Sequence, residues 1–382
     1  MNKRSNVLRW RSKLPAGLVW SYLLRVSWCA LLVGAGHTDA AAQTPRTDAQ
    51  ARAIAARFAP IFYQSLGAQP RHDYITNFDF DGDWRGDNNW VHADDPKFPL
   101  KAYIYYAVSE TATHYFIHYA VFHPRDYKGG ATRGRLLSDL LNETVKRSGK
   151  YDPTGVAEVA TVAHENDMEG CLVVVAKAGE DVARGRVAYV ETLAHNRFLR
   201  YTATAANADS VRLDGQHPEL YVEPKGHGIG AYLAAEEQRI HKGLLRYVYE
   251  GRADAPAPNK ETVSYDLLPL LTTLWARAQQ GVGETYGLAT DYGSVRVSVA
   301  LSAGGTKEKR VQIGKRGSAF LGRIGGHNIA RPPWGWIDRK ERALPGAWFF
   351  DPAATIKRHF NLRDDFAVAY LWQPFLQIGT GR

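Results

Sequence analysis

The residues best suited to chemistry in this sequence stand together in one short segment. His164-Glu-Asn-Asp-Met-Glu169 places one imidazole and three carboxylates within six positions. In a β-strand Asp167 and Glu169 would point to the same face, and His164 would join them if the chain turned at Asn166. Carboxylate oxygens are preferred by Ca²⁺ and Mg²⁺, and an imidazole also admits Mn²⁺ or Zn²⁺. The segment therefore indicates a divalent-cation site, with a solvated polar turn before a strand as the simpler alternative.

Other catalytic patterns are missing from the sequence. A zinc-protease motif that began at His164-Glu165 would need a second histidine at the position of Met168. The chain has no Gly-x-Ser-x-Gly elbow and no Gly-rich phosphate loop. Cys171 stands in an apolar run, which is typical of a small buried hydrophobic residue rather than a nucleophile.

Two further motifs carry a resemblance to known families. Tyr119-Ala-Val-Phe-His-Pro-Arg-Asp126, followed by the His164–Glu169 segment, resembles the core of the necrosis- and ethylene-inducing-peptide-like cytolysins. That family has a strand ending in aromatic-Pro-basic-Asp, followed by Gly-His-Arg-His-Asp-Trp-Glu. The vacuolar protein sorting-associated protein 62 family has a later His-Pro-x-x-Tyr-x-x-x-Gly-x-His pattern, which the segment from His217 to His227 approximates. The resemblance extends from about Tyr103 to Tyr232.

The resemblance implies a fold, a site and a class of ligand. It implies a β-sandwich that binds a glycan or a lipid headgroup, with peripheral membrane contact as one way to reach a lipid. It also implies that four residues line a divalent-cation pocket: Asp126, His164, Asp167 and Glu169. Met168 departs from the Trp of the family motif, and Tyr127–Ala163 is a long insertion. These departures speak against membrane-damaging activity.

Two more histidines are candidates for acid–base chemistry beside this pocket. His195 stands where both families tend to place a histidine at a strand end, and His227 lies between Gly226 and Gly228. Glycines permit a tight turn and a close backbone approach. Either imidazole could exchange a proton near neutral pH, although each could also be a hydrogen-bonded turn residue.

A second acidic cluster precedes these motifs. Its carboxylates alternate around a glycine like the first half of a calcium loop, but Trp90 stands where such a loop has its twelfth-position Glu. A capped, Asx-rich turn is the alternative interpretation. The candidate ligands are Asp79, Asp81, Asp83 and Asp87.

The elements around these residues predict a mainly β protein. Strand-like runs rich in β-branched and aromatic residues recur along the chain. We expect strands at Ala102–Val108, Tyr115–Phe122, Cys171–Ala176, Arg186–Leu193, Phe198–Ala203, Glu219–Val222 and Ser294–Leu301. Helical spacing predicts helices from Ala51 through Phe58 towards Tyr63, capped by Thr47 and Asp48, and at Arg135–Arg147, Ala234–Tyr249 and Tyr265–Gln279. The sequence thus favours one β-sandwich with peripheral helices over residues 43–382.

Aromatic residues are concentrated near the C-terminus. The stretch from Trp334 to Phe350 holds several Trp and Phe residues. Such a cluster could offer a platform for a sugar or a lipid headgroup. Closing the sandwich core is the favoured interpretation of this C-terminal extension.

The N-terminus has the pattern of an export signal. Basic residues precede the apolar run Val26–Ala35, and small residues follow through Ala42. Arg25 would be costly inside a membrane span, so we expect residues 1–42 to be removed and Gln43 to begin an exported protein. The leader carries six basic residues and one acidic residue, so its removal lowers the formal net charge from +9 to +4. This modest charge argues against a nucleic-acid partner.

Three functions fit these patterns. The first is an exported, cation-dependent protein that binds a glycan or lipid headgroup. The second is a metal-assisted hydrolase with His227 or His195 as acid or base. The third is a structural protein whose ion ties loops together.

Overall fold

Long runs of β-branched and aromatic residues make the described chain mainly β. The computed structural model describes residues 46–67, 69–127, 163–203, 209–233, 243–324, 329–341 and 345–380. They belong to one compact unit, Thr44–Arg382. The predicted leader 1–42, the predicted helix Arg135–Arg147 and most of the predicted helix that begins at Ala234 lie outside the described residues.

One large mixed sheet organises the chain. Its first half is an antiparallel series in the order β2 (Tyr103–Thr111), β3 (His114–Asp126), β4 (His164–Ala176), β5 (Arg186–Leu193) and β6 (Phe198–Thr202). On the other side of β2 the sheet continues through β11 (Thr262–Pro269), β10 (Leu244–Tyr249), β1 (Ile61–Ser65), β8 (His217–Val222) and β7 (Leu213–Asp214), with β9 (Ile229–Ala231) on β8. The strands expected around the cation motif are therefore present, and β4 begins earlier than expected.

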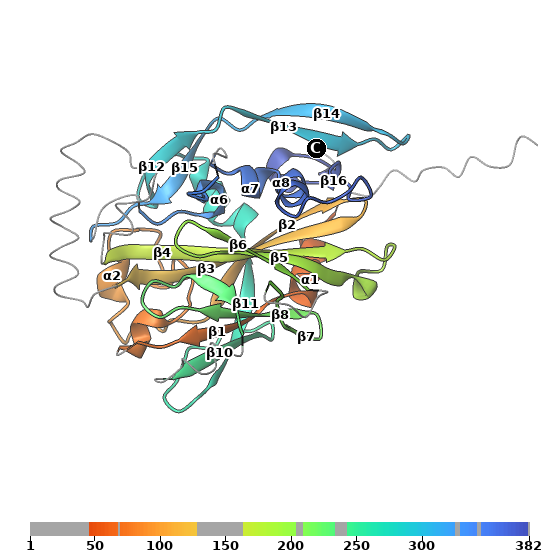
Figure 1. Cartoon of the computed structure of the whole chain (residues 1–382). Coiled ribbons are helices and arrows are strands. Elements are labelled where there is room, and N and C mark those ends of the chain that lie inside the picture. Colours follow the sequence, from red (N-terminus) through yellow and green to blue (C-terminus); the bar gives the residue numbers. More distant parts are fainter. Residues whose placement is uncertain are drawn as a thin grey trace, which may run out of the picture. The chain divides into compact units, whose positions relative to one another are not determined.

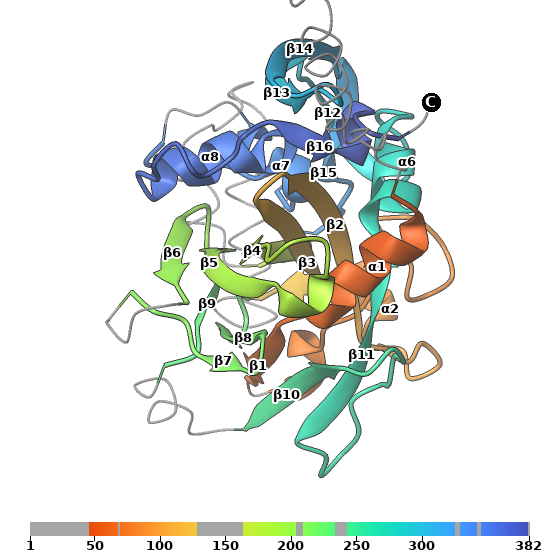
Figure 2. The ribbon, with the colours of Figure 1, turned by 90° about the vertical axis from the view of Figure 1, so that its right-hand side faces the viewer.

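The sheet curls so that its two halves face each other. Figures 1 and 2 both place β1, β8 and β10 on one side of β3 and β4, and β9 contacts β4 and β5. One hydrophobic core fills the space between the halves and includes Phe62, Val121 and Leu220. This arrangement is the predicted β-sandwich, built here by one folded-over sheet.

A C-terminal layer covers the outer face of β2 to β5 (Figures 1 and 2). It holds the hairpin β13 (Ser294–Ala300) and β14 (Thr306–Gln312), the pair β12 (Tyr286–Asp291) and β15 (Lys315–Phe320), β16 (Tyr370–Trp372), and the helices α6 (Leu274–Ala278), α7 (Ala347–Phe350) and α8 (Pro352–His359). Trp334, Trp336 and Trp348 are buried in a second core between this layer and the sheet. The favoured interpretation of the aromatic stretch, a core rather than an exposed platform, is confirmed.

Short helices and 3₁₀ turns lie around the sheet. The first helix, α1 (Asp48–Arg57), begins with a capping box in which Thr47 and Gln50 bond each other's backbone. It ends at Arg57, and Tyr63 lies in β1 rather than at a helix end. The remaining short elements are α2 (Asn89–His92) and the 3₁₀ turns Pro70–Asp73, Val182–Arg184, Leu270–Thr272, Pro333–Gly335 and Pro374–Leu376.

Of two further predicted helices, one is wrong over its described part and the other is wrong over its first residues. Leu244–Tyr249 is strand β10, and the segment from Tyr265 runs in β11 before the short helix α6. Leu245 and Tyr247 are buried while Leu244 and Arg246 are half-exposed, which is the period of a strand. Parallel pairing of β10 with β11 decides the conformation, and a local pattern cannot report such a long-range partner. Among the described helices, none has both the length and the apolar character to span a membrane.

Candidate cation and ligand site

The β3–β4 pair brings the two motifs of the predicted site together. Asp126 at the end of β3 is the register partner of His164 at the start of β4. Asp126 Oδ2 lies 3.6 Å from His164 Nε2. The long insertion Tyr127–Ala163 therefore does not separate them, because both its ends lie at the same end of this hairpin.

A turn at Asn166 sets the direction of His164. Asn166 has a φ of 60°, in the left-handed backbone region. Residues other than glycine are uncommon there, and supporting contacts stabilise them. The Asn166 amide supplies that support, because its Nδ2 donates to the carbonyl oxygens of Gly86 and Leu321 and its Oδ1 accepts from Asn89 Nδ2. The chain thus turns where the sequence suggested, and His164 lines the same cavity as Asp167 and Glu169.

The position of one proton on His164 is fixed by its backbone contact. Nδ1 lies 2.7 Å from the carbonyl oxygen of Asn166. A carbonyl oxygen can only accept, so Nδ1 carries the hydrogen and Nε2 is the atom that faces Asp126. In metal sites, a histidine is usually oriented in this way: one ring N–H donates to a backbone carbonyl, and the other ring nitrogen binds the metal.

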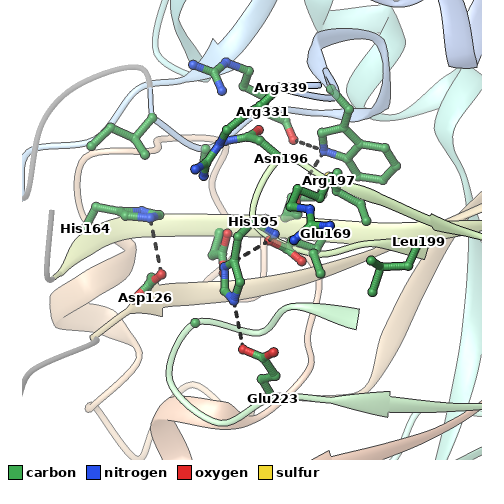
Figure 3. Close-up of a pocket in the computed structure, with 18 residues that line it drawn as sticks. Asp126, His164, Glu169, His195, Asn196, Arg197, Leu199, Glu223, Arg331 and Arg339 are labelled. Atoms are coloured by element: carbon green, nitrogen blue, oxygen red, sulfur yellow. Dashed lines mark hydrogen bonds and ion pairs between the residues drawn. The ribbon is translucent and has the colours of Figure 1, made fainter. Parts of the chain in front are cut away.

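The four predicted ligands line one cavity of about 450 Å³, here called the His164 cavity. Figure 3 shows Asp126, His164 and Glu169 around it, with His195 and Glu223 beside them. Such a volume is within the range of small-molecule sites, roughly 300–1,000 Å³. The side chains of the four candidate ligands are all buried. The cavity therefore gathers several buried carboxylates in one place.

Behind Asp167 lies a buried network that sequence reasoning captured only in part. His227 Nδ1 is 2.9 Å from Asp167 Oδ2, and His227 Nε2 is 3.4 Å from Asp73 Oδ1. The His227 ring stacks on His123 with centroids 3.6 Å apart. His227 is 0% exposed and does not line the His164 cavity. Its predicted role as an acid or base that touches a substrate finds no support here, whereas a positioning role behind Asp167 does.

The charges in this network are set by burial and by carboxylates. Burial lowers the pKa of His227, but hydrogen bonds and charges from Asp167 and Asp73 outweigh it and raise that pKa to about 9. Burial would raise the pKa of Asp73, yet His227 and two backbone N–H groups bring it below its usual range. Burial, reinforced by the His227 charge, holds the pKa of His123 well below its ordinary value. The stacked pair therefore consists of one charged and one neutral imidazole.

The residues closest to metal-ligand spacing are a slightly different set. Among the described residues, the group of three whose ligand atoms all lie within 4.8 Å of one another is His123, Asp167 and His227. Asp167 is common to this group and to the predicted four. The sequence contained a signal for His123, which stands three residues before Asp126 in the aromatic-His-Pro-Arg-Asp motif. Nothing local marked Asp73, which reaches the site from a separate 3₁₀ turn.

Of the two histidines predicted to act as acid or base, His195 is the one that lines the His164 cavity. Its backbone N–H donates to Glu169 Oε1 at 2.9 Å, and its Nε2 lies 2.8 Å from Glu223 Oε2 (Figure 3). The His195 backbone has a left-handed φ of 51°, and its ring lies towards these carboxylates. Gly228 allows this approach, because a Cβ there would lie 2.9 Å from His195 Nε2.

The third carboxylate of the acidic hexapeptide points elsewhere. Glu165 accepts hydrogen bonds from the backbone N–H groups of Trp90 and Arg323. Burial raises the pKa of Glu165, and those bonds lower it by less. Arg125, also buried, lies over the Trp90 ring and reaches Asp94 and His72. Glu165 and Arg125 fix the walls around the site and are not part of it.

The second acidic cluster pairs its carboxylates locally. Asp81 contacts His92 Nδ1 at 2.5 Å, Asp83 accepts from Arg85 N, and Asp87 pairs with the Arg85 guanidinium. Asp79 accepts from the Asn77 amide. These are the contacts of an Asx-rich turn. The structure does not bring the four carboxylates together as ligands of one ion, so the calcium loop stays a prediction that these contacts do not support.

Comparison with known proteins gives a partial likeness. No family model and no curated protein matches the chain. A structure described as a toxin fold for microbial attack and plant defense is 15% identical, with 49% of this chain and 70% of that chain covered and a TM-score of 0.27. NLPPya in complex with glucosamine gives 17% identity, coverage of 49% and 71%, and a TM-score of 0.29. Necrosis and Ethylene inducing Protein 2 from the causal agent of cocoa's Witches Broom disease gives 14%, coverage of 47% and 67%, and 0.26.

These matches concern the cytolysin family that the motifs resemble. They span about half of this chain at low identity. None of them extends the likeness to the vacuolar protein sorting-associated protein 62 family.

Proposed function

We propose that this protein is exported and binds a glycan or a lipid headgroup in the His164 cavity with the help of a divalent cation. The single observation that carries the proposal is that Asp126, His164, Asp167 and Glu169 line one cavity. The ligand class comes from the motif resemblance, and export comes from the predicted leader.

The donor set fits a hard divalent cation. Ligand bonds of about 2.0–2.6 Å allow Asp126 Oδ2 and His164 Nε2, 3.6 Å apart, to bind one ion. The orientation of His164 leaves Nε2 facing a carboxylate oxygen, and a nitrogen acceptor and a carboxylate oxygen are both suitable ligands of one cation. Oxygen ligands outnumber nitrogen, which favours Ca²⁺ or Mg²⁺ over Mn²⁺ or Zn²⁺.

The remaining walls of the cavity suit a polar ligand of modest size. A bound cation would supply coordination to sugar hydroxyl oxygens. His195, Glu223 and Asn196 offer hydrogen-bonding groups, and Trp336 offers part of an aromatic ring. A few placed polar groups among apolar and aromatic side chains are typical of small-molecule sites.

Binding accounts for the geometry better than hydrolysis does. A metal-assisted hydrolase needs an acid or base within reach of a substrate, and His227 has no exposed atoms. His195 reaches the cavity but is held between Glu169 and Glu223. A purely structural ion would not account for a cavity of about 450 Å³ beside it.

Calorimetric titration tests the proposal. Ca²⁺, Mg²⁺, Mn²⁺ and Zn²⁺ are titrated separately into the protein, and glucosamine is then titrated into the best cation complex. Asp126→Asn is expected to weaken cation binding at least tenfold. Asp364→Asn is the matched control because Asp364 is fully exposed and pairs with Lys357 on the surface.

Two results would remove the proposal. One is the absence of binding by all four cations, and the other is equal cation affinity in Asp126→Asn and in the control. Export has its own test, because a secreted chain whose first residue is Gln43 would verify removal of the leader.

A further inference from the structure

We infer that the ligand of the His164 cavity is an acidic sugar, which the cation holds on one side and arginines hold on the other. The inference rests on the proposed function and deepens it, because it names the charge of the ligand. It comes from a wall of arginines in the cavity, of which Arg331 and Arg339 lie outside the region of family resemblance.

Three arginines form that wall. Arg197, Arg331 and Arg339 line the cavity together with the carboxylates. Figure 3 shows Arg331 and Arg339 on the side of the cavity away from Asp126 and Glu223. The cavity therefore has acidic groups on the β3–β4 side and the Arg331 and Arg339 guanidinium groups on the opposite side, while Arg197 stands on the β5–β6 turn.

Backbone contacts hold this wall against the sheet. Arg339 N donates to the carbonyl oxygen of Asn196 at 2.9 Å, and Phe198 N donates to Asp338 Oδ2 at 2.8 Å. Trp336 Nε1 donates to the carbonyl oxygen of Arg331 at 2.8 Å. Arg331 and Arg339 are thus carried by a segment that is fixed to the β5–β6 turn, and that turn itself carries Arg197.

The charge of the lining depends on the cation. Four carboxylates and three guanidiniums leave one net negative charge when the histidines are neutral. One divalent cation reverses this to one net positive charge. Such a reversal changes the sign of the charge that a ligand meets in the cavity. An anionic ligand is therefore favoured only when the cation is bound, and the two bind cooperatively.

One donor on this wall is already buried without an acceptor. The Nε of Arg339 has no hydrogen-bond partner within the described chain. A buried donor left without an acceptor is costly, and an oxyanion on the ligand would satisfy it. Guanidinium groups bind carboxylates and phosphates in paired hydrogen bonds. The structure therefore assigns to this wall a carboxylate or phosphate carried on a sugar ring.

The test compares charged and neutral sugars by calorimetry with Ca²⁺ present and absent. Glucuronate and glucose 6-phosphate are the anionic probes, glucose is the neutral probe, and glucosamine is the cationic one. We expect at least one anionic probe to bind at least tenfold more tightly than glucose when Ca²⁺ is present. The ranking of the two anionic probes tells whether a carboxylate or a phosphate is recognised.

Arginine variants show whether the wall is responsible. Arg339→Gln and Arg197→Gln are expected to weaken the anionic probe about ten- to hundredfold, with Ca²⁺ affinity unchanged. Arg184→Gln is the control, since Arg184 is largely exposed and lies in a distant 3₁₀ turn. Arg197 is exposed, so this variant remains informative even if Arg339→Gln fails to fold.

The outcomes separate the inference from the proposed function. Ca²⁺ binding without any preference for an anionic probe overturns the inference and leaves the proposed function standing. Tight binding of an anionic probe without any cation overturns the cooperative binding that we infer, and it also removes the cation from the proposed function. Unchanged affinity in both arginine variants overturns the inference.

Discussion

Asp126 and His164 face each other across the last register position of the β3–β4 pair, with Oδ2 and Nε2 3.6 Å apart. Their backbones are fixed by the ladder, and the His164 ring is fixed by the carbonyl of Asn166. The His164 ring cannot turn away without breaking its bond to that carbonyl. The sheet therefore brings together an oxygen and a nitrogen atom that the proposed cation could share.

Cation binding is expected to stabilise the folded state. A ligand that binds only the folded protein adds about 2.7 kcal/mol at one hundred times its Kd. Thermal unfolding with and without saturating Ca²⁺ should show a higher Tm with the ion. The increase should be lost in Asp126→Asn and in His164→Ala and retained in Asp364→Asn. An increase of equal size in all four proteins would contradict a site at this pair.

His227 is expected to matter more for stability than His195. Its loss leaves the buried carboxylates of Asp73 and Asp167 without their cationic partner, which costs about 3–5 kcal/mol. His227→Gln should therefore lower the free energy of unfolding in urea by about that amount. His195→Gln should cost less than about 1 kcal/mol, because the His195 side chain is 32% exposed. Similar losses in the two variants would speak against the buried network.

The sequence was informative where short motifs meet across neighbouring strands. A period of two placed Asp167 and Glu169 on one face, and the turn at Asn166 was visible as an interruption of that period. The aromatic C-terminal stretch was recognisable as a core because so many large rings rarely stay in water. These predictions depend on local pattern alone.

Other parts of the site depend on partners that lie far away in the chain. Asp73 and Glu223 reach His227 and His195 from a separate turn and a separate loop. The arginine wall is brought to the cavity by the bond from Arg339 to Asn196. No local period reports such contacts, and the same limit explains why β10 and part of β11 were predicted as helix.

The acidic loop is expected to contribute no second cation. Asp83 accepts hydrogen bonds from Arg85 N at 2.8 Å and from Asn88 Nδ2 at 3.0 Å, so its carboxylate already has donors. Asp83→Asn should leave the calorimetric Ca²⁺ stoichiometry and affinity unchanged. A fall in stoichiometry in this variant would restore the calcium-loop interpretation.

Stability is expected to fall in acid because of His118. Its ring lies among Trp348 and Phe349, and burial lowers its pKa from 6.5 to about 3. At a pH between these two values, His118 is therefore protonated in the unfolded chain and neutral in the folded chain. Above pH 6.5 this contribution is constant, and below it the free energy of unfolding falls by up to about 1.4 kcal/mol per pH unit.

Urea unfolding between pH 7 and pH 4 measures the effect of His118. The variant His118→Gln keeps a donor for the Trp348 carbonyl, which His118 Nε2 contacts at 3.0 Å. The free energy of unfolding should fall less steeply with decreasing pH in this variant than in the wild type. The difference in slope is the contribution of His118. Equal slopes would show that other groups carry the acid sensitivity.

Gly170 is expected to be required for the shape of the His164 cavity. It lies in β4 next to Glu169, and a Cβ at this position would lie 2.1 Å from the carbonyl oxygen of Tyr119 and 2.6 Å from Trp336. The backbone of the β3–β4 ladder must therefore shift, and the Trp336 ring, which is part of the cavity wall, must move as well. Gly170→Ala should therefore cost about 1–3 kcal/mol and weaken sugar binding.

Gly283→Ala is the matched control, because a Cβ there would meet nothing within 4 Å. The free energy of unfolding in urea and the intrinsic Trp fluorescence of both variants would be compared with those of the wild type. A shifted emission maximum in Gly170→Ala alone would report the displaced indole. If Gly170→Ala were as stable as the control and bound sugar as well, close contact between β4 and Trp336 would not shape the cavity.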